Sequence, residues 1–121
     1  MATEQLEEIM IQCYGTGAYY KTMLPHFYYT DGVKTFCENA GAYWFLTDVI
    51  AYSTEFLHKD TFFSVKLVVK DSIGSIIITD GNRKTFKRVD DIHTDCPDGE
   101  WKFYIEKDMN GDSIMLYYME H

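Results

Sequence analysis

The sequence lacks an apolar run close to the roughly 20 residues that a membrane-spanning helix needs. Its first residues also lack the basic start and apolar stretch of a secretory signal peptide, so we expect a cytoplasmic protein without a membrane partner. The three cysteines, Cys13, Cys37 and Cys96, form an odd and scattered set. This spacing differs from the paired framework of a small secreted scaffold and predicts reduced thiols.

Basic residues are scarce: 11 Lys and Arg stand against 19 Asp and Glu, which gives a formal net charge of −8. Such a field disfavours direct binding to nucleic acid or anionic membranes and favours a partner with a basic surface.

The sequence also has little that could carry catalysis or hold a metal. Residues 93–97 bring together His93, Asp95 and Cys96, types that could bind zinc or build a nucleophile and base pair. A metal site needs a second ligand cluster, and the other histidines are not paired at ligand spacing. We therefore predict no catalytic residue, metal or cofactor, and interpret this segment as a capped, proline-terminated loop.

What the sequence has in quantity is apolar and aromatic surface. Hydrophobic residues make up 46% of the 121 residues and aromatic residues 17%, which is too much for a disordered chain. The length suits one domain, so we expect residues 1–121 to share a single core, with a helical part over about 1–58 and a sheet part over about 61–120.

Apolar residues recur at helical spacing in the first half of the chain. The first set predicts a helix over residues 3–13, and the next proline limits any helical turn in residues 18–24 to a short piece. Thr30 or Asp31 is expected to cap a short helix that the following glycine ends. The main core helix is predicted over residues 42–56.

In the second half the apolar period changes to two, which is typical of strands. Strands are predicted at residues 63–69, 76–79, 101–106 and 114–118. Turns are predicted at residues 71–74, 80–82 and 110–111. Helices followed by strands predict an α+β fold, with the N-terminal helices packed on one face of an antiparallel sheet of about four strands.

Charge is segregated between the second and third predicted strands. A basic set that could hold a phosphate, or instead protect an edge strand, consists of Arg83, Lys84, Lys87 and Arg88. The acidic set just downstream consists of Asp90, Asp91, Asp95, Asp98 and Glu100. The acidic set could form a docking face for a basic partner, or a single polar excursion between strands.

Aromatic residues also occur in adjacent pairs, as at Tyr28-Tyr29 and Tyr43-Trp44. Neighbouring side chains cannot all face one core, so some tyrosines must be partly exposed. Exposed tyrosines are good interface anchors and can also stack on bases, whereas a structural role would place them at a wet edge of the core. A sheet face left uncovered and lined by tyrosine would suggest self-association, such as a homodimer.

Five segments of the sequence form a recognisable series: residues 29–34, 40–48, 80–82, 93–97 and 115–120. In order and spacing they resemble a catalogued domain of unknown function found in bacteria and their phages, and the resemblance covers most of the chain from about Tyr14. It implies a phage or mobile-element setting and a small accessory protein. The family pattern has an aromatic residue where Cys96 stands, which implies that Cys96 is not an essential thiol.

The leading hypothesis is therefore an accessory protein, and not an enzyme, that binds a host protein with a basic surface in the host cytosol. One such role is an anti-CRISPR or other anti-defence inhibitor that occludes a surface for nucleic acid. Its predicted partner-binding residues are Asp90, Asp91, Asp95, Asp98, Glu100, Tyr28, Tyr29 and Tyr43. The alternative is a protein that sequesters a nucleotide or other small ligand, bound by Arg83, Lys84, Lys87 and Arg88.

Overall fold

The computed structural model describes residues 1–80 and 84–121, in which it has three helices and seven strands, an α+β fold as predicted. The helices are α1 (Thr3–Met10), α2 (Asp31–Ala40) and α3 (Tyr43–Ser53), with short 3-10 turns η1 (Leu57–Lys59) and η2 (Tyr118–Glu120). The strands are β1 (Tyr19–Lys21), β2 (Phe27–Thr30), β3 (Phe62–Lys70), β4 (Ile73–Thr79), β5 (Thr85–His93), β6 (Gly99–Lys107) and β7 (Ser113–Tyr117). None of the described helices is long and apolar enough to cross a membrane.

The seven strands form one mixed sheet in the order β1-β2-β7-β6-β3-β4-β5. β2 runs parallel to β7, and the other neighbouring pairs are antiparallel. The prediction of about four antiparallel strands is therefore wrong in number and in one direction. The four predicted strands correspond to β3, β4, β6 and β7, and the strands beyond them are β1, β2 and β5.

The three additional strands carry weak sequence signals. Residues 18–24 contain β1 rather than a helical turn, because Tyr20 pairs with Tyr29 across a β1–β2 hairpin. Both strands lie within the part of the chain predicted as helical, yet they extend the sheet beyond β7. β5 is an edge strand with exposed or half-buried side chains on both faces, so no alternation of apolar and polar residues marks it.

The helices have ends that local chemistry explains. Thr30 is the N-cap of α2, and its hydroxyl accepts a hydrogen bond from the Val33 backbone N–H at 3.4 Å. Of the two predicted caps, Thr30 is therefore the one that the structure confirms. Gly41 ends the same helix with a φ of 62°, a left-handed conformation that glycine adopts without strain. α1 and α3 are shorter than predicted and end at Met10 and Ser53.

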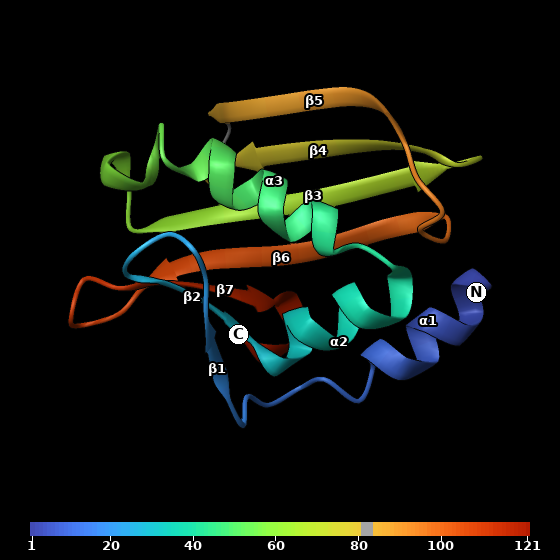
Figure 1. Ribbon diagram of the computed structural model, residues 1–121, viewed down its shortest axis with the longest axis horizontal. Helices are drawn as coiled ribbons and strands as arrows, with labels where there is room; N and C mark the ends of the chain where they lie inside the picture. The colour runs from blue at the N-terminus through green and yellow to red at the C-terminus, as the bar shows by residue number, and fades with distance from the viewer. Residues whose placement is uncertain (81–83) are drawn as a thin grey trace.

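The helices lie on one face of the sheet, which forms the core with them (Figure 1). Phe103 of β6 is buried at the centre, with its ring centroid 5.0 Å from that of Phe36 in α2 and 5.2 Å from that of Phe45 in α3. Aromatic contacts of this kind add about 0.5–1.5 kcal/mol each beyond the area they bury. These three phenylalanines therefore join α2 and α3 to the sheet.

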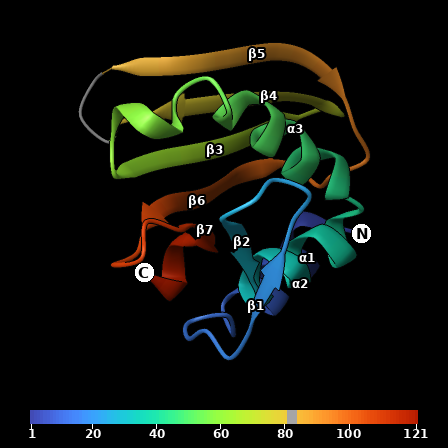
Figure 2. The same ribbon diagram turned by 60° about the vertical axis from the view of Figure 1, so that its left-hand side comes forward.

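The opposite face of the sheet, here called the open face, is covered by none of α1, α2 and α3 (Figure 2). The C-terminal turn η2 reaches it, because the ring centroid of His121 lies 5.0 Å from that of Tyr104. Most strand residues of this face are half-buried or exposed and mix apolar with charged side chains, whereas Thr30 and Leu116 are buried.

Lys66 and Glu100 form an ion pair across the open face, with Nζ and Oε1 3.1 Å apart. Tyr104 is half-buried there beside Phe62, with ring centroids 5.0 Å apart, and the C-terminal His121 packs on both rings. Self-association through the rest of this face remains a prediction.

The carboxylate of Glu120 joins the C-terminal turn η2 to the start of α2 and to the segment before β1. It accepts four hydrogen bonds. Thr30 and Thr16 donate through their hydroxyls at 2.6 and 2.9 Å. The backbone N–H groups of Tyr117 and Gly32 donate at 2.9 and 3.3 Å. Because Gly32 lies in the first turn of α2, the carboxylate also meets the positive end of that helix. We call these five residues the Glu120 clasp.

Candidate functional site

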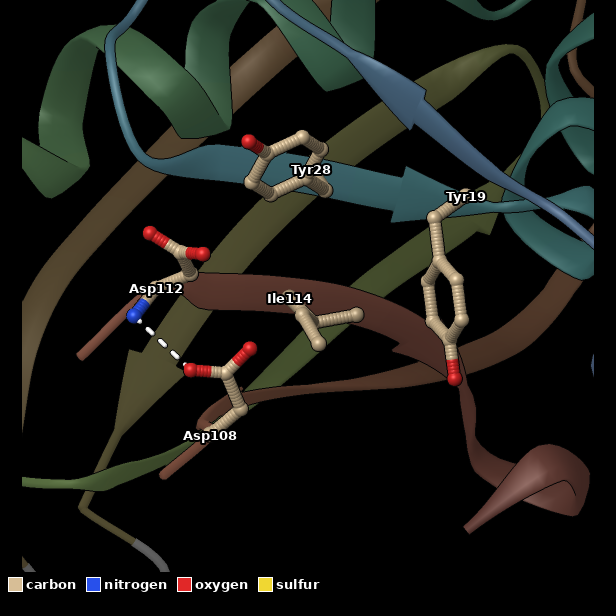
Figure 3. Close-up of a pocket in the computed structure, with 5 residues that line it drawn as sticks. All are labelled: Tyr19, Tyr28, Asp108, Asp112 and Ile114. Carbon is tan, nitrogen blue, oxygen red and sulfur yellow. Dashed lines mark hydrogen bonds between the residues drawn. The ribbon is translucent and has the colours of Figure 1, made fainter. Parts of the chain in front are cut away.

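A hollow lies on the open face, where β1, β2 and β7 meet. It has a volume of about 370 Å³ and is lined by Tyr19, Tyr28, Asp108, Asp112 and Ile114. Figure 3 shows Ile114 between the two tyrosine rings and the two carboxylates, so the hollow is aromatic on one side and acidic on the other. We call it the tyrosine–aspartate pocket.

The backbone register of the sheet brings the pocket together. Tyr28 of β2 lies opposite Ile114 of β7 in the parallel pair, although 86 positions separate them in the chain. Tyr19 comes from β1, which pairs with β2 as a hairpin. Because side chains alternate along a strand, the parallel pairing determines which tyrosine of the Tyr28-Tyr29 pair faces the pocket.

Asp108 holds the β6–β7 turn that supplies the acidic side. Its Oδ1 accepts hydrogen bonds from the backbone N–H groups of Asn110 at 2.8 Å and Asp112 at 3.0 Å. Gly111 has a φ of 83°, which suits the turn that Asn110-Gly111 predicts, and this prediction is confirmed. Within the described chain, Oδ2 of Asp108 accepts no hydrogen bond, which leaves one oxygen available to a ligand.

Asp112 connects this turn to the β1–β2 loop. Its Oδ1 lies 2.8 Å from Nδ1 of His26, and the backbone N–H of Ser113 donates to the His26 carbonyl at 2.8 Å. The Asp112 side chain is 20% exposed and the His26 side chain 80% exposed, so the carboxylate is the more sheltered partner. Among the described residues, Oδ2 of Asp112 and the hydroxyls of Tyr19 and Tyr28 have no hydrogen-bond partner.

A second, smaller hollow lies on the helix side of the β1–β2 loop. It has a volume of about 180 Å³, and its lining is mainly apolar: Thr22, Met23, Tyr29, Leu46, Thr47 and Ile50. Met23 is fully exposed, and so is Met109 in the β6–β7 turn. The two loops therefore meet through His26 and Asp112, and each carries an exposed methionine. We call residues 22–26 and 108–112, with the tyrosine–aspartate pocket, the pocket end.

The predicted acidic set lies elsewhere, in β5, in the β5–β6 connection and at the start of β6. Asp90 is exposed, and hydrogen bonds from Ser75 and Arg88 lower the pKa of its carboxyl. Glu100 is paired with Lys66. The acidic set and the predicted tyrosines therefore do not form one site. Asp91, Asp95 and Asp98 of the set are exposed.

The three predicted tyrosines occupy different surfaces. Tyr28 lines the tyrosine–aspartate pocket, whereas Tyr29 lines the apolar hollow and packs on Tyr20, with ring centroids 5.3 Å apart. Tyr43 begins α3 and is exposed, and its hydroxyl lies 3.4 Å from Oε1 of Glu38. The structure thus places Tyr28 and Tyr29 on the two sides of the β1–β2 hairpin at the pocket end.

Of the predicted basic set, Lys87 and Arg88 lie in edge strand β5, and Lys84 directly precedes it. Arg83 is outside the described residues, and so is most of the predicted turn at 80–82. The amine of Lys87 lies 4.9 Å from the ring centroid of Tyr52 in α3. Arg88 instead pairs with Asp90, with Nε and Oδ1 3.1 Å apart. These side chains contact separate partners, so the described residues of the set do not converge on one anion, and the nucleotide-binding alternative stays a prediction.

His93 and Cys96 do not form a pair. His93 is exposed at the end of β5, and Cys96 is buried in the core, where burial raises the pKa of its thiol to about 12. The hydroxyl of Thr94 accepts a hydrogen bond from the Cys96 backbone N–H at 3.0 Å, as a capped loop would have it. In residues 1–80 and 84–121, no group of three or more His, Cys, Asp or Glu side chains could hold a metal ion.

Of the five residues that line the pocket, only Tyr28 was predicted from the sequence to be a binding residue. Asp108 and Asp112 were expected only in a hairpin turn, and Tyr19 in a helical turn. The available signal was the pair of aspartates at the predicted turn, next to an alternating strand. Nothing in the sequence indicates that this turn lies beside β2.

The chain belongs to a family of unknown function, DUF6876, whose model matches residues 4–120. The match confirms the resemblance to a domain of unknown function and covers nearly the whole chain. No curated protein and no solved structure matches the chain.

Proposed function

We propose that this member of DUF6876 acts by binding a protein partner through its pocket end. The observation that carries the proposal is the pair of fully exposed methionines, Met23 and Met109, on two loops that hydrogen bonds join. Methionine and tyrosine are enriched at protein interfaces, and flexible methionine side chains adapt to a partner's surface. A small ligand enclosed in the pocket would leave both methionine side chains in water, whereas a protein would cover them.

The two hollows add to this proposal. They lie on opposite sides of the β1–β2 hairpin, one with two carboxylates and one mainly apolar. A partner that covers the hairpin could place a basic side chain in the first hollow and an apolar one in the second. The formal net charge of −8 favours a basic surface on the partner and fast encounter with it.

The family setting extends the proposal to the kind of partner. We propose that the partner binds nucleic acid, as a CRISPR nuclease or another defence protein does, and that this chain inhibits it by occluding its basic surface. The exposed carboxylates of Asp91, Asp95 and Asp98 support this reading, because they could contact the same basic surface away from the pocket end. An isolated partner whose nucleic-acid binding is unaffected by the chain would refute this extension alone.

The test is capture of partners from a host lysate by the wild-type chain and by the double variant Met23→Ser/Met109→Ser. Because both side chains are fully exposed, the variant should fold with a free energy of unfolding within about 0.5 kcal/mol of the wild type. Truncating an interface anchor costs about 1–2 kcal/mol, so we expect capture to fall at least tenfold.

The matched control is Ile11→Ser, which removes an exposed apolar side chain at the C-terminal end of α1. In Figure 1, α1 lies at the other end of the molecule from the turn between β6 and β7. The control variant should capture the partner as the wild type does. Equal losses in the control and the double variant, or no loss in the double variant, would refute the pocket end as the interface.

A further inference from the structure

We propose that the tyrosine–aspartate pocket holds the guanidinium group of one arginine side chain of the protein partner. This inference rests on the proposed function, since the partner supplies the arginine. It assigns the pocket a ligand class through three features: the free carboxylate oxygens, the aromatic rings and the volume.

The carboxylates provide the charge. Oδ1 of Asp108 accepts hydrogen bonds from two backbone N–H groups, and Oδ1 of Asp112 is hydrogen-bonded to His26. Each keeps an Oδ2 without a partner among the described residues. Two such oxygens suit a guanidinium group, which presents several N–H donors in one plane. Because the Asp112 side chain is only 20% exposed, its charge is less screened than that of a surface carboxylate.

The rings provide the second feature. Tyr19 and Tyr28 flank Ile114, and neither hydroxyl has a hydrogen-bond partner in the described chain (Figure 3). A cation over a tyrosine ring is attracted by about 0.5–1 kcal/mol at an exposed site and by about 2 kcal/mol when desolvated. A guanidinium stacks on aromatic faces and is less strongly hydrated than an ammonium, so arginine fits this lining better than lysine.

The pocket has room for this guest. Its volume of about 370 Å³ lies in the range of pockets that take small ligands, which begins at about 300 Å³. No lysine or arginine of the described chain is among its lining residues. The chain uses cation contacts of this kind elsewhere, since the amine of Lys34 lies 4.6 Å from the ring centroid of Tyr20. The pocket offers the same contact to a cation from outside.

The experiment follows the Ile114 side chain, which lies at the centre of the lining. The chain is labelled at isoleucine δ1 methyl groups and titrated with acetyl-Gly-Arg-Gly-amide, while methyl NMR spectra are recorded. We expect a saturable shift of the Ile114 methyl, with a dissociation constant on the order of 1 mM for a single side chain. The citrulline peptide keeps the shape but not the charge of arginine, and should leave the signal unmoved.

Two variants locate the charge contact. Asp112→Asn should weaken arginine binding at least tenfold, while Asp71→Asn, an equal charge change at an exposed site in the β3–β4 turn, should leave it unchanged. The lysine peptide should bind more weakly than the arginine peptide. Failure of the Ile114 methyl to shift with arginine, or an equal shift with citrulline, overturns the inference without using any variant.

This outcome is separable from that of the proposed function. If Met23→Ser/Met109→Ser abolishes partner capture but Asp112→Asn does not, the pocket end remains the interface and the arginine site is refuted. If both variants abolish capture and the arginine peptide competes with the partner, both proposals are supported.

Discussion

The Glu120 clasp gives a prediction that the structure makes quantitative. Replacing Glu120 by alanine removes the acceptor of four hydrogen bonds, two of them from the backbone N–H groups of Gly32 and Tyr117. A hydrogen bond to a charged group contributes about 1.5–3 kcal/mol, and the threonine hydroxyls can turn to other partners or water. Because Glu120 is half-buried, water can partly replace it, so we expect the free energy of unfolding to fall by about 3 kcal/mol.

Gly32→Ala tests the same clasp from the other side. A Cβ at position 32 would overlap the carboxylate of Glu120, so the carboxylate must leave its partners. The loss should approach that of Glu120→Ala, reduced by the gain of about 1 kcal/mol that alanine brings to a helix. In the Glu120→Ala background no overlap remains, so the same substitution should be neutral or stabilising.

The assay is urea unfolding followed by tryptophan fluorescence, for the two single variants and the double variant. We expect a coupling free energy of about 2 kcal/mol or more between the two positions. The control is Gly15→Ala, where a Cβ would meet no atom within 4 Å. Additive losses in the double variant would refute the reasoning, because they would show that Gly32 is not needed to admit the carboxylate.

Three further predictions concern stability and association. The free energy of unfolding should fall as pH rises above about 9, because the thiols of Cys37 and Cys96 ionise there in the unfolded chain, whereas burial in the folded protein raises their pKa to about 12. Urea unfolding curves from neutral to alkaline pH measure this, and a free energy that does not change with pH would contradict it. Trp101→Phe should cost about 1–3 kcal/mol in urea unfolding, because the buried Nε1–H of Trp101 donates to the Pro97 carbonyl at 3.1 Å; an unchanged midpoint would count against it. Self-association through the open face should make the sedimentation coefficient rise with protein concentration, and Ile77→Glu, a change in β4 on that face, should remove the rise. A wild-type chain that stays monomeric refutes this prediction.

The parts of the fold that local chemistry determines could be predicted from the sequence. Thr30 and Gly41 mark the two ends of α2, and alternation of apolar residues marks β3 and β6. Asn110-Gly111 marks the hairpin between β6 and β7. Each of these signals lies within a few residues of the feature that it predicts, so no tertiary information is needed.

The rest depends on contacts between distant residues. The parallel pairing of β2 with β7 joins residues 27–29 to residues 113–115, and no local pattern encodes it. β5 is an edge strand, whose charged side chains look like those of a loop. The tyrosine–aspartate pocket depends on the first of these contacts, which explains why Tyr28 could be proposed as a binding residue while its neighbours Asp112 and Ile114 could not.

The central claim is that the pocket end is a protein interface, and site-specific photocrosslinking tests it most directly. A photoreactive phenylalanine analogue replaces Met109 in one chain and Ile11 in another, both exposed positions. In a host lysate, we predict that the chain labelled at position 109 forms one salt-sensitive crosslinked product with a protein, and that Met23→Ser weakens that product. A chain that gives no product at position 109, or the same set of products at positions 109 and 11, would contradict the claim.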